Sequence, residues 1–309
     1  MKKWTIMAAV VALICGSSAS SQVLGDNARE QIGYGYIANN DLFGDGRDRW
    51  QSSSVATSRV RGYGWDGDLP DAPGELLEIR FQGRIIAPAD VENPLPGDRV
   101  YASTWSLGAH THFNVNGSEF SLGADMVISG PQTGLHLMQN ATHELLNRDL
   151  VSDTVLNDGV QNGFHPGVVV EYARPILLTS DTQIRPFAEL RTGDETLLRS
   201  GVDLYLGTVG GNDFLVRDPV TGQRYRAVQG DYFQGYGLMV GGDFTSMQDS
   251  IYFPSSGPAM LDSRTRLRAG MVWQGNQNSL FYGLTYLGKE FEGQEEPQLV
   301  GSIRLNLEF

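Results

Sequence analysis

Two histidines and a glutamine in one short segment are the side chains of this sequence best suited to acid–base chemistry. His136, Gln139 and His143 are spaced at i, i+3 and i+7, which places them on one face of a helix. An imidazole can take a proton from water near neutral pH, and a polar neighbour one turn away can hold the ring in one tautomer. His143, oriented by Gln139 or by a carboxylate, is therefore a candidate general base for ester hydrolysis. The spacing alone also fits a surface helix with an incidental histidine.

The segment that carries these residues is predicted to be a short amphipathic helix. Gly130 and Pro131 end the preceding element, because proline has no N–H group and fixes φ. From Leu135 onward there is no glycine or proline until Gly159, and apolar residues recur at near-helical spacing. Such a helix needs a scaffold that holds it against other chemical groups.

The rest of the chain consists of segments of about ten residues that alternate in polarity. In Leu299–Phe309 every second residue is apolar or small, which is the period of a β-strand, and the segment ends on an aromatic residue. A soluble β-sandwich also fits alternation alone, but an even number of such strands is typical of a membrane barrel. We therefore predict an all-β protein, a twelve-stranded antiparallel transmembrane β-barrel with a short helix in an extracellular loop. The strands are expected to begin near Gly33, Ser53, Glu75, Val100, Glu119, Pro166, Gln183, Leu197, Tyr232, Thr265, Leu280 and Leu299.

The N-terminus has the features of a secretory signal peptide. Lys2 and Lys3 precede an apolar run from Trp4 to Cys15, and small residues follow this run. The run is too short to cross a bilayer about 30 Å thick. We expect a signal peptide at 1–21 and an outer-membrane β-barrel at 22–309, located in the cell outer membrane.

Acidic residues outnumber basic ones by 36 to 23, and the formal net charge is −13 at pH 7. Such a surface repels nucleic acid, so we exclude nucleic acid as a partner. The same surface could bind divalent cations, and we expect a monomer. Four glutamates in the last outward connection are predicted to form a solvated loop; they are Glu290, Glu292, Glu295 and Glu296.

Counting the strands assigns the connections to the two sides of the membrane. If the N-terminus lies in the periplasm, three long connections face outward, namely 41–52, 88–99 and 130–165. The third of these carries the predicted helix. One connection does not fit, because residues 207–231 fall on the periplasmic side, where turns are usually short.

Several motifs lie at the outward ends of the strands. They are Asn40-Asp41, Asp48-Arg49 followed by Ser52, Arg99-Val100-Tyr101-Ala102, and Gly130-Pro131 followed by Gln139 and His143. This set resembles the outer-membrane lipid A 3′-O-deacylase family, whose members are twelve-stranded, calcium-dependent barrels. The resemblance extends from about Gly33 to the C-terminus and is tightest at 130–143, where the spacing needs no gap.

The resemblance implies roles for individual residues. It implies that His143 is the catalytic base, that Asn40 and Asp41 lie beside it and hold Ca²⁺, and that Ser52 is an active-site hydroxyl. A shift of one residue, to Asn39 and Asn40, is possible. Ca²⁺ prefers oxygen ligands and would polarise the ester carbonyl, while His143 activates a water. A Ser52 nucleophile is the competing mechanism, but we prefer water because Ser52 lies in a run of serines without a G-x-S-x-G turn.

Two departures from the family pattern bear on activity. The family sequence Tyr-Thr/Ser-x-Gly is Gln-Ser-Ser-Ser at 51–54, and the lysine that serves the oxyanion in one branch is replaced by Asn93. Calcium, a backbone N–H or an arginine such as Arg84 would have to take the place of that lysine. Removing one oxyanion donor typically costs about 100- to 1000-fold in rate, so activity would be weakened or lost without a substitute.

These observations predict a calcium-dependent lipid A 3′-O-deacylase that hydrolyses the 3′-linked acyl ester of lipopolysaccharide in the outer leaflet. A lateral groove at that level is required, because the substrate lies in the membrane. Gln139, Arg84, Arg49 and Arg99 complete the expected substrate site. Arg49 and Arg99, like Arg47, either pair with lipid A phosphates or are ordinary rim charges. The alternative is a catalytically silent outer-membrane barrel with a lipopolysaccharide-binding or structural role. A small pore is a third hypothesis, disfavoured because a twelve-stranded interior is easily filled by side chains.

Overall fold

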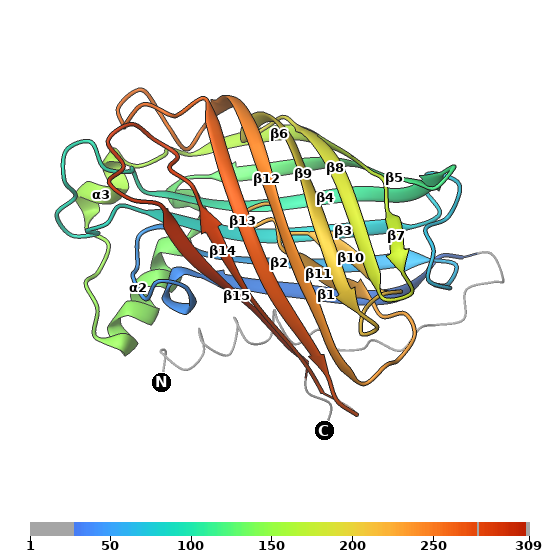
Figure 1. The fold of residues 1–309 in the computed structure, drawn as a ribbon. Coiled ribbons are helices and arrows are strands. Elements are labelled where there is room, and N and C mark those ends of the chain that lie inside the picture. Colours follow the sequence, from blue (N-terminus) through green and yellow to red (C-terminus); the bar gives the residue numbers. More distant parts are fainter. Residues whose placement is uncertain (1–27, 277, 307–309) are drawn as a thin grey trace.

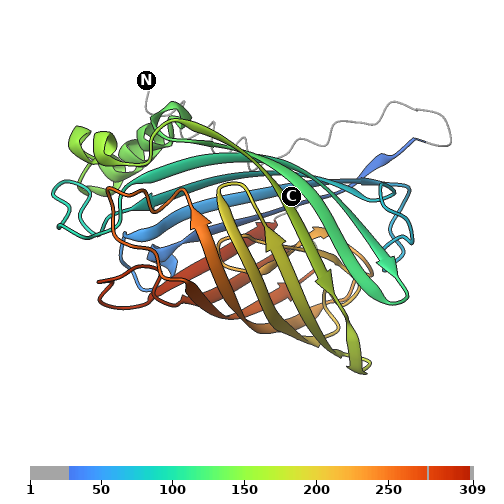
Figure 2. The ribbon, with the colours of Figure 1, turned by 90° about the horizontal axis from the view of Figure 1, so that it is seen from above.

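The alternating segments form a closed antiparallel β-barrel in the computed structural model, which describes residues 28–276 and 278–306 (Figures 1 and 2). The predicted signal peptide at 1–21 and the terminal Phe309 lie outside these residues. Neighbouring strands pair in chain order, and the sheet closes where β1 pairs with β15 and β6 pairs with β8. The wall strands are β1 (Glu30–Asn40), β2 (Trp50–Gly62), β3 (Leu77–Ala87), β4 (Ala102–Val115), β5 (Ser118–Ser129), β6 (Gly163–Ala173), β7 (Ile176–Thr179), β8 (Thr182–Arg191), β9 (Glu195–Gly207), β12 (Gly235–Ser250), β13 (Ser263–Gln274), β14 (Ser279–Leu287) and β15 (Gln298–Asn306).

The barrel has twelve wall strands, because β6 and β7 form one interrupted strand. Both pair with β8, and Pro175 lies between them. Proline cannot donate to a ladder hydrogen bond, so the strand breaks there. The prediction of a twelve-stranded antiparallel barrel is confirmed, and each expected strand start lies within three residues of the observed one.

Side chains alternate between an apolar outer face and a polar lumen. In β13, Leu267, Met271 and Trp273 are exposed on the outside, whereas Arg266 and Arg268 are buried inside. A continuous band of exposed large apolar side chains is unfavourable in water and is matched by lipid. The outer surface of the wall is therefore suited to contact with lipid in a membrane. Among the described residues, no helix is both long enough and apolar enough to span one.

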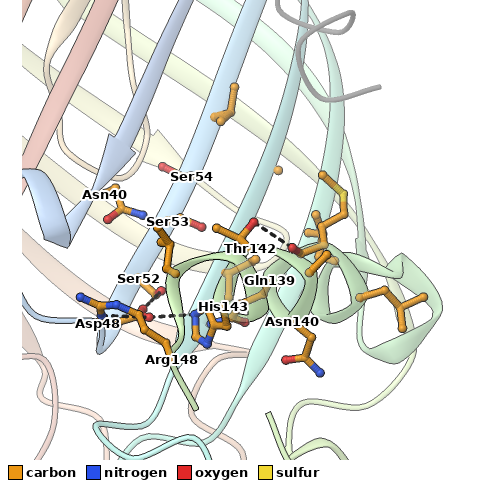
Figure 3. Close-up of a pocket in the computed structure, with 18 of the residues that line it drawn as sticks. Asn40, Asp48, Ser52, Ser53, Ser54, Gln139, Asn140, Thr142, His143 and Arg148 are labelled. Atoms are coloured by element: carbon orange, nitrogen blue, oxygen red, sulfur yellow. Dashed lines mark hydrogen bonds and ion pairs between the residues drawn. The ribbon is translucent and has the colours of Figure 1, made fainter. Parts of the chain in front are cut away.

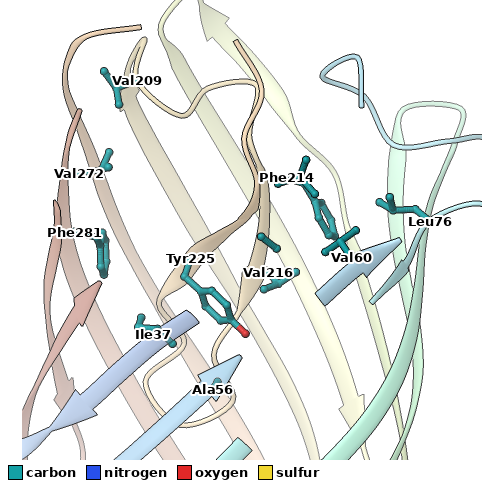
Figure 4. Close-up of a cluster of buried hydrophobic side chains, with 12 residues drawn as sticks. Ile37, Ala56, Val60, Leu76, Val209, Phe214, Val216, Tyr225, Val272 and Phe281 are labelled. Carbon is teal, nitrogen blue, oxygen red and sulfur yellow. The ribbon is translucent and has the colours of Figure 1, made fainter. Parts of the chain in front are cut away.

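The long connection at 207–231 does not extend away from the barrel but folds back into the lumen. It forms a hairpin of β10 (Phe214–Arg217) and β11 (Arg224–Val228), whose Tyr225 is buried among apolar residues of the wall (Figure 4). The hairpin lies against β1, where Gly35 allows the backbone to approach closely. This inward fold explains a connection that is too long for a periplasmic turn.

Charged side chains inside the lumen are joined to one another and to the hairpin. Arg217 of β10 binds Glu171 and Asp203 of the wall, each at 2.8 Å. At the hairpin tip, Arg266 of the wall donates to the carbonyl oxygen of Val220 at 3.0 Å. Buried charges are tolerated only when paired and hydrogen-bonded. These contacts fix the hairpin in place.

The three predicted outward connections lie at one end of the barrel. This end carries the helices α2 (Leu135–Leu146) and α3 (Asp153–Asp158) and two short 3₁₀ helices, η1 (Asp41–Phe43) and η2 (Pro131–Thr133) (Figure 1). The predicted helix is confirmed and starts at Leu135. The last connection is not simply solvated, since Glu290 is buried and paired with Arg99 and Arg264.

We expect Gly35→Ala to destabilise the barrel by about 1–3 kcal/mol, because the new methyl group overpacks the lumen. A Cβ at Gly35 would lie 2.2 Å from the carbonyl oxygen of Arg226 in the hairpin, whereas one at Gly211 would meet nothing closer than 3.6 Å. Urea unfolding in micelles, followed by tryptophan fluorescence, measures the effect, with Gly211→Ala as the matched control. Equal midpoints for both variants would show that the hairpin does not pack against β1.

Candidate active site

A groove of about 950 Å³ lies on the outside of the barrel, between α2 and the wall strands β2, β3 and β4 (Figure 3). Its wall side is lined by Val55, Thr57, Phe81 and Trp105, which alternate with residues buried in the lumen and therefore face outward. The helix side is largely apolar and includes Leu137, Met138 and Leu145. The groove thus opens toward the lipid-facing surface, as expected for a lateral groove.

Two stacked aromatic rings form the floor of the groove. The rings of Phe81 and Trp105 are 4.8 Å apart at an interplanar angle of 19°. Trp105 lies over Gly83, where a Cβ would come within 2.4 Å of the indole, and its Nε1 donates to the carbonyl oxygen of Thr133 at 3.0 Å. The missing side chain at Gly83 lets the indole lie flat against the sheet. The floor is therefore a broad apolar surface.

Asp48, His143 and Ser52 meet at the polar end of the groove (Figure 3). The carboxylate of Asp48 binds Nε2 of His143 through Oδ2 at 2.8 Å and accepts the hydroxyl of Ser52 through Oδ1 at 2.6 Å. His143 comes from the last turn of α2, whereas Asp48 lies two residues before the start of β2. Asp48 therefore links the helix to the barrel wall.

An irregular start of β2 places Ser52. The register of β2 against β3 shifts between Trp50 and Ser53, and Trp50 adopts φ 52°, a conformation that non-glycine residues rarely take. A bulge of this kind turns side chains away from the face that strict alternation assigns them. It explains how Ser52 reaches Asp48 while Ser54, in the regular part of the strand, binds Asn39 in the lumen.

Both ring nitrogens of His143 face acceptors. Nε2 faces Asp48, and Nδ1 lies within hydrogen-bond distance of the carbonyl oxygen of Asp149, to which it can only donate. The hydrogen bond with Asp48 is the main reason that the pKa of His143 is raised above its ordinary value. Burial favours the neutral form of Asp48, but hydrogen bonds from His143 and Ser52 outweigh it and lower its pKa. The two side chains form an ion pair whenever His143 is protonated.

Gln139 lines the groove but does not touch His143. Its Oε1 accepts the hydroxyl of Tyr101 at 2.9 Å, and its Nε2 has no partner among the described residues. Of the two groups expected to orient the imidazole, Gln139 or a carboxylate, Gln139 is therefore ruled out. Asp48 and the backbone of Asp149 orient the ring instead.

Asp41 lies at the same mouth of the barrel as His143 but is not in contact with it. Its side chain is fully buried; Oδ2 accepts the N–H of Arg49 at 2.6 Å, and Oδ1 has no partner among the described residues. Burial is the main cause that raises the pKa of Asp41 to about 8. Asn40 lines the groove, and its side chain accepts the N–H of Leu42. Asn40 and Asp41 are thus brought near the site, with Asp48 rather than Asp41 touching His143.

The residues around Asp41 fit a calcium ion in one respect. A buried carboxylate oxygen without a donor is chemically suited to a hard cation. Within residues 28–276 and 278–306, however, no group of three or more His, Cys, Asp or Glu side chains is spaced to hold a metal. Backbone carbonyls, amide oxygens and water would have to complete the coordination.

None of the three arginines expected to bind substrate lines the groove. Arg84 points into the lumen, donates to Gln51 at 3.0 Å and lies over the ring of Tyr252. Arg99 is buried against Glu290, and Arg49 pairs with Asp45 at 3.3 Å and with Glu296 at 3.1 Å. Arg49 and Arg99 therefore form ion pairs within the protein, as the rim-charge alternative expects, and not with a ligand in the groove. Arg84 does not line the groove, where a substitute oxyanion donor would have to lie.

Sequence reasoning missed three charged residues that line the groove, which are Asp48, Glu144 and Arg148. Asp48 belongs to the Asp48-Arg49 motif, but no catalytic or binding role was predicted for it. Its spacing of four residues from Ser52 was a signal that the two side chains could meet. No local signal linked Asp48 to His143, because their contact depends on how α2 leans across the wall.

No protein-family model matches the chain, and no curated protein matches its sequence. Among solved structures, LpxR from Salmonella typhimurium matches with a TM-score of 0.71 at 15% identity, covering 90% of this chain and 100% of that chain. The fold is that of LpxR. The resemblance expected from the motifs thus extends to the architecture, and this closed barrel, with its lipid-facing belt, is located in the outer membrane.

Two other barrels also match over most of their length, but much less closely. The NanC porin has a TM-score of 0.41 at 7% identity, covering 90% of this chain and 100% of that chain. The beta domain of the Bordetella autotransporter BrkA has a TM-score of 0.42 at 10% identity, covering 90% and 99%. These matches are too distant to bear on the site.

We expect Ca²⁺ to stabilise the wild-type protein and to have no such effect on Asp41→Asn, because an amide cannot supply the charge that the cation needs. At tenfold excess over its dissociation constant the ion would contribute about 1.4 kcal/mol. Unfolding temperatures with calcium and with a chelator measure this, and Asp158→Asn, at an exposed site in α3, is the control. An unchanged calcium response in Asp41→Asn would remove Asp41 as a ligand.

Proposed function

We propose that this protein is a lipid A 3′-O-deacylase, which hydrolyses the 3′-linked acyl ester of lipopolysaccharide in the outer leaflet. The observation that carries the proposal is the Asp48–His143 pair at the polar end of an apolar groove that opens laterally. The shared fold supports it, since LpxR is a lipid A 3′-O-deacylase.

The groove suits a substrate that stays in the membrane. An acyl chain that moves from the bilayer onto the ring surface of Phe81 and Trp105 leaves one apolar environment for another. Entry therefore costs little desolvation, and the polar ester arrives at the end of the groove where the ionisable side chains lie. A water-soluble ester would gain much less from this geometry.

His143 acts as the base in the reaction that we propose. In its neutral form the ring donates Nδ1–H to Asp149, which leaves the lone pair on Nε2. A water that enters between Nε2 and Asp48 gives its proton to the ring and attacks the acyl carbonyl. The bond between carbonyl carbon and sugar oxygen then breaks, and the imidazolium returns the proton to the sugar oxygen. Asp48 stabilises the imidazolium during the step.

The contacts of Ser52 favour water over serine as the nucleophile. The hydroxyl of Ser52 donates to Asp48 at 2.6 Å and makes no hydrogen bond to His143. A serine nucleophile needs a base within reach of its proton. In the proposed reaction Ser52 is a positioning residue, which holds the second oxygen of Asp48.

Calcium remains part of the proposal. Asp41 would bind the ion through its unpartnered oxygen, with Asn40 beside it. When bound, the ion supplies positive charge that polarises the acyl carbonyl.

A catalytically silent barrel that binds lipopolysaccharide is the second candidate. The observation that favours it is that both nitrogens of His143 are engaged, so the base is not free in this conformation. The pore hypothesis is weaker, because the hairpin of β10 and β11 occupies the lumen. A monomer remains the expectation for either candidate.

Mass spectrometry of lipid A from cells that express the protein tests the proposed activity. We expect the wild type to release one ester-linked acyl chain, and His143→Ala to lower this release by about 10²- to 10⁴-fold, because general-base catalysis contributes that much. His165→Ala is the control, since His165 binds Ser129 and does not line the groove. Unmodified lipid A from a correctly inserted wild type, supplied with calcium, would support the silent barrel.

The pH dependence of kcat/KM tests the pairing of the base. His143 must be neutral to accept a proton, and its pKa is raised by Asp48, so activity should be lost as pH falls through a midpoint above 6.5. Asp48→Asn removes the cause of the increase and should move this midpoint to lower pH, besides reducing kcat. An identical midpoint in wild type and variant would contradict His143 as the titrating base.

A further inference from the structure

Arg148 is the one lysine or arginine among the described residues that line the groove. It follows Asn147, the C-cap of α2, which takes a left-handed conformation and turns the chain back. The backbone N–H of Arg148 donates to the carbonyl oxygen of His143 at 2.9 Å. The position of Arg148 relative to His143 is therefore set by the helix cap.

The guanidinium of Arg148 differs from the others at this mouth of the barrel. Arg47 and Arg49 pair with Glu296, and Arg99 pairs with Glu290. The acid opposite Arg148 is Asp48, whose Oδ2 is 3.6 Å from Nη1 and already binds His143. This distance is too long for a hydrogen bond, and the side chain is 36% exposed. Its donors are not used by any other residue that the structure describes.

An exposed guanidinium beside a hydrolytic pair, at the end of an apolar groove, matches an amphiphile with an anionic head (Figure 3). Guanidinium forms two parallel hydrogen bonds with phosphate, which makes arginine a preferred phosphate ligand. In the proposed substrate, the sugar carbon next to the one that carries the 3′ ester bears the 4′-phosphate. A 3′ ester placed at His143 therefore brings that phosphate close to the neighbouring cation.

We propose that Arg148 binds the 4′-phosphate of lipid A and makes the groove selective for the phosphorylated form. This inference rests on the proposed function, because it names the group that the same site recognises beside the ester. It assigns Arg148 to binding of the substrate and not to stabilisation of the reacting carbonyl. If Arg148 binds the phosphate, its loss should not affect a substrate that lacks the phosphate. If Arg148 stabilises the reacting carbonyl, its loss should affect both substrates equally.

The test compares lipid A with and without the 4′-phosphate, in detergent micelles, for wild type, Arg148→Ala and Arg148→Lys. We expect Arg148→Ala to lower kcat/KM about 10- to 100-fold on the phosphorylated lipid, mainly through KM, and to leave the dephosphorylated lipid within about twofold. Arg148→Lys should recover part of the loss, since it keeps the charge but not the bidentate geometry. Equal losses on both lipids, or no loss on either, would overturn the assignment.

Two controls separate this inference from failure of the proposed function. Arg47→Ala removes an exposed charge at the same mouth without touching the groove, so it should not change the preference between the lipids. Thermophoresis also measures binding of the two lipids to His143→Ala and to the double variant that adds Arg148→Ala. The heat-dependent shift in gel mobility of folded barrels first shows that both proteins are folded. If the wild type releases no acyl chain, the proposed function fails. A phosphate-dependent affinity that needs Arg148 would still support the inference, and its absence would refute it.

Discussion

The need to satisfy every backbone hydrogen bond in an apolar medium governs this structure. An open sheet edge in lipid leaves N–H and C=O groups without partners, at a cost of several kcal/mol each, so the sheet must close. Closure is made by β1 with β15 and by β6 with β8. It also fixes β2 to β5 side by side, and α2, which follows β5, can lean back across β4 and β3 toward the start of β2. The meeting of His143 with Asp48 depends on this arrangement.

The lumen supports the site from behind. Asp218, at the tip of the inward hairpin, accepts a hydrogen bond from Asn39 at 3.1 Å, and Asn39 also binds Ser54 at 2.9 Å and Ser302 at 2.7 Å. The next residues along the chain are Asn40, which lines the groove, and Asp41. The backbone that leads into the polar end of the groove is thus held by β2, β15 and the hairpin together. Polar networks of this kind rigidify a structure when every member is paired.

The sequence allowed the wall to be predicted because a period of two is a local property. The twelve strands followed from it, and counting them gave the outward position of 130–165, while the helix that starts at Leu135 followed from helical spacing, which is also local. The partner of His143 could not be predicted, because Asp48 is distant in the chain and Ser52 reaches it through a bulge that breaks the period. Arg84 and Arg99 were predicted to lie in the substrate site, but both are buried. The sequence does not distinguish an arginine that is exposed to solvent from one that pairs with a buried carboxylate, as Arg99 does with Glu290. The catalytic and calcium roles of the site stay predictions.

The inward hairpin has a consequence for the envelope as a whole. Its backbone lies against the wall near Gly35, its apolar side chains pack around Tyr225, and its arginines are tied to carboxylates on several strands. In a barrel that is open along its axis, water and small solutes diffuse through the lumen. Here the hairpin and its ion pairs occupy part of that path, so an inserted copy offers the envelope a narrower leak than an open barrel with the same number of strands.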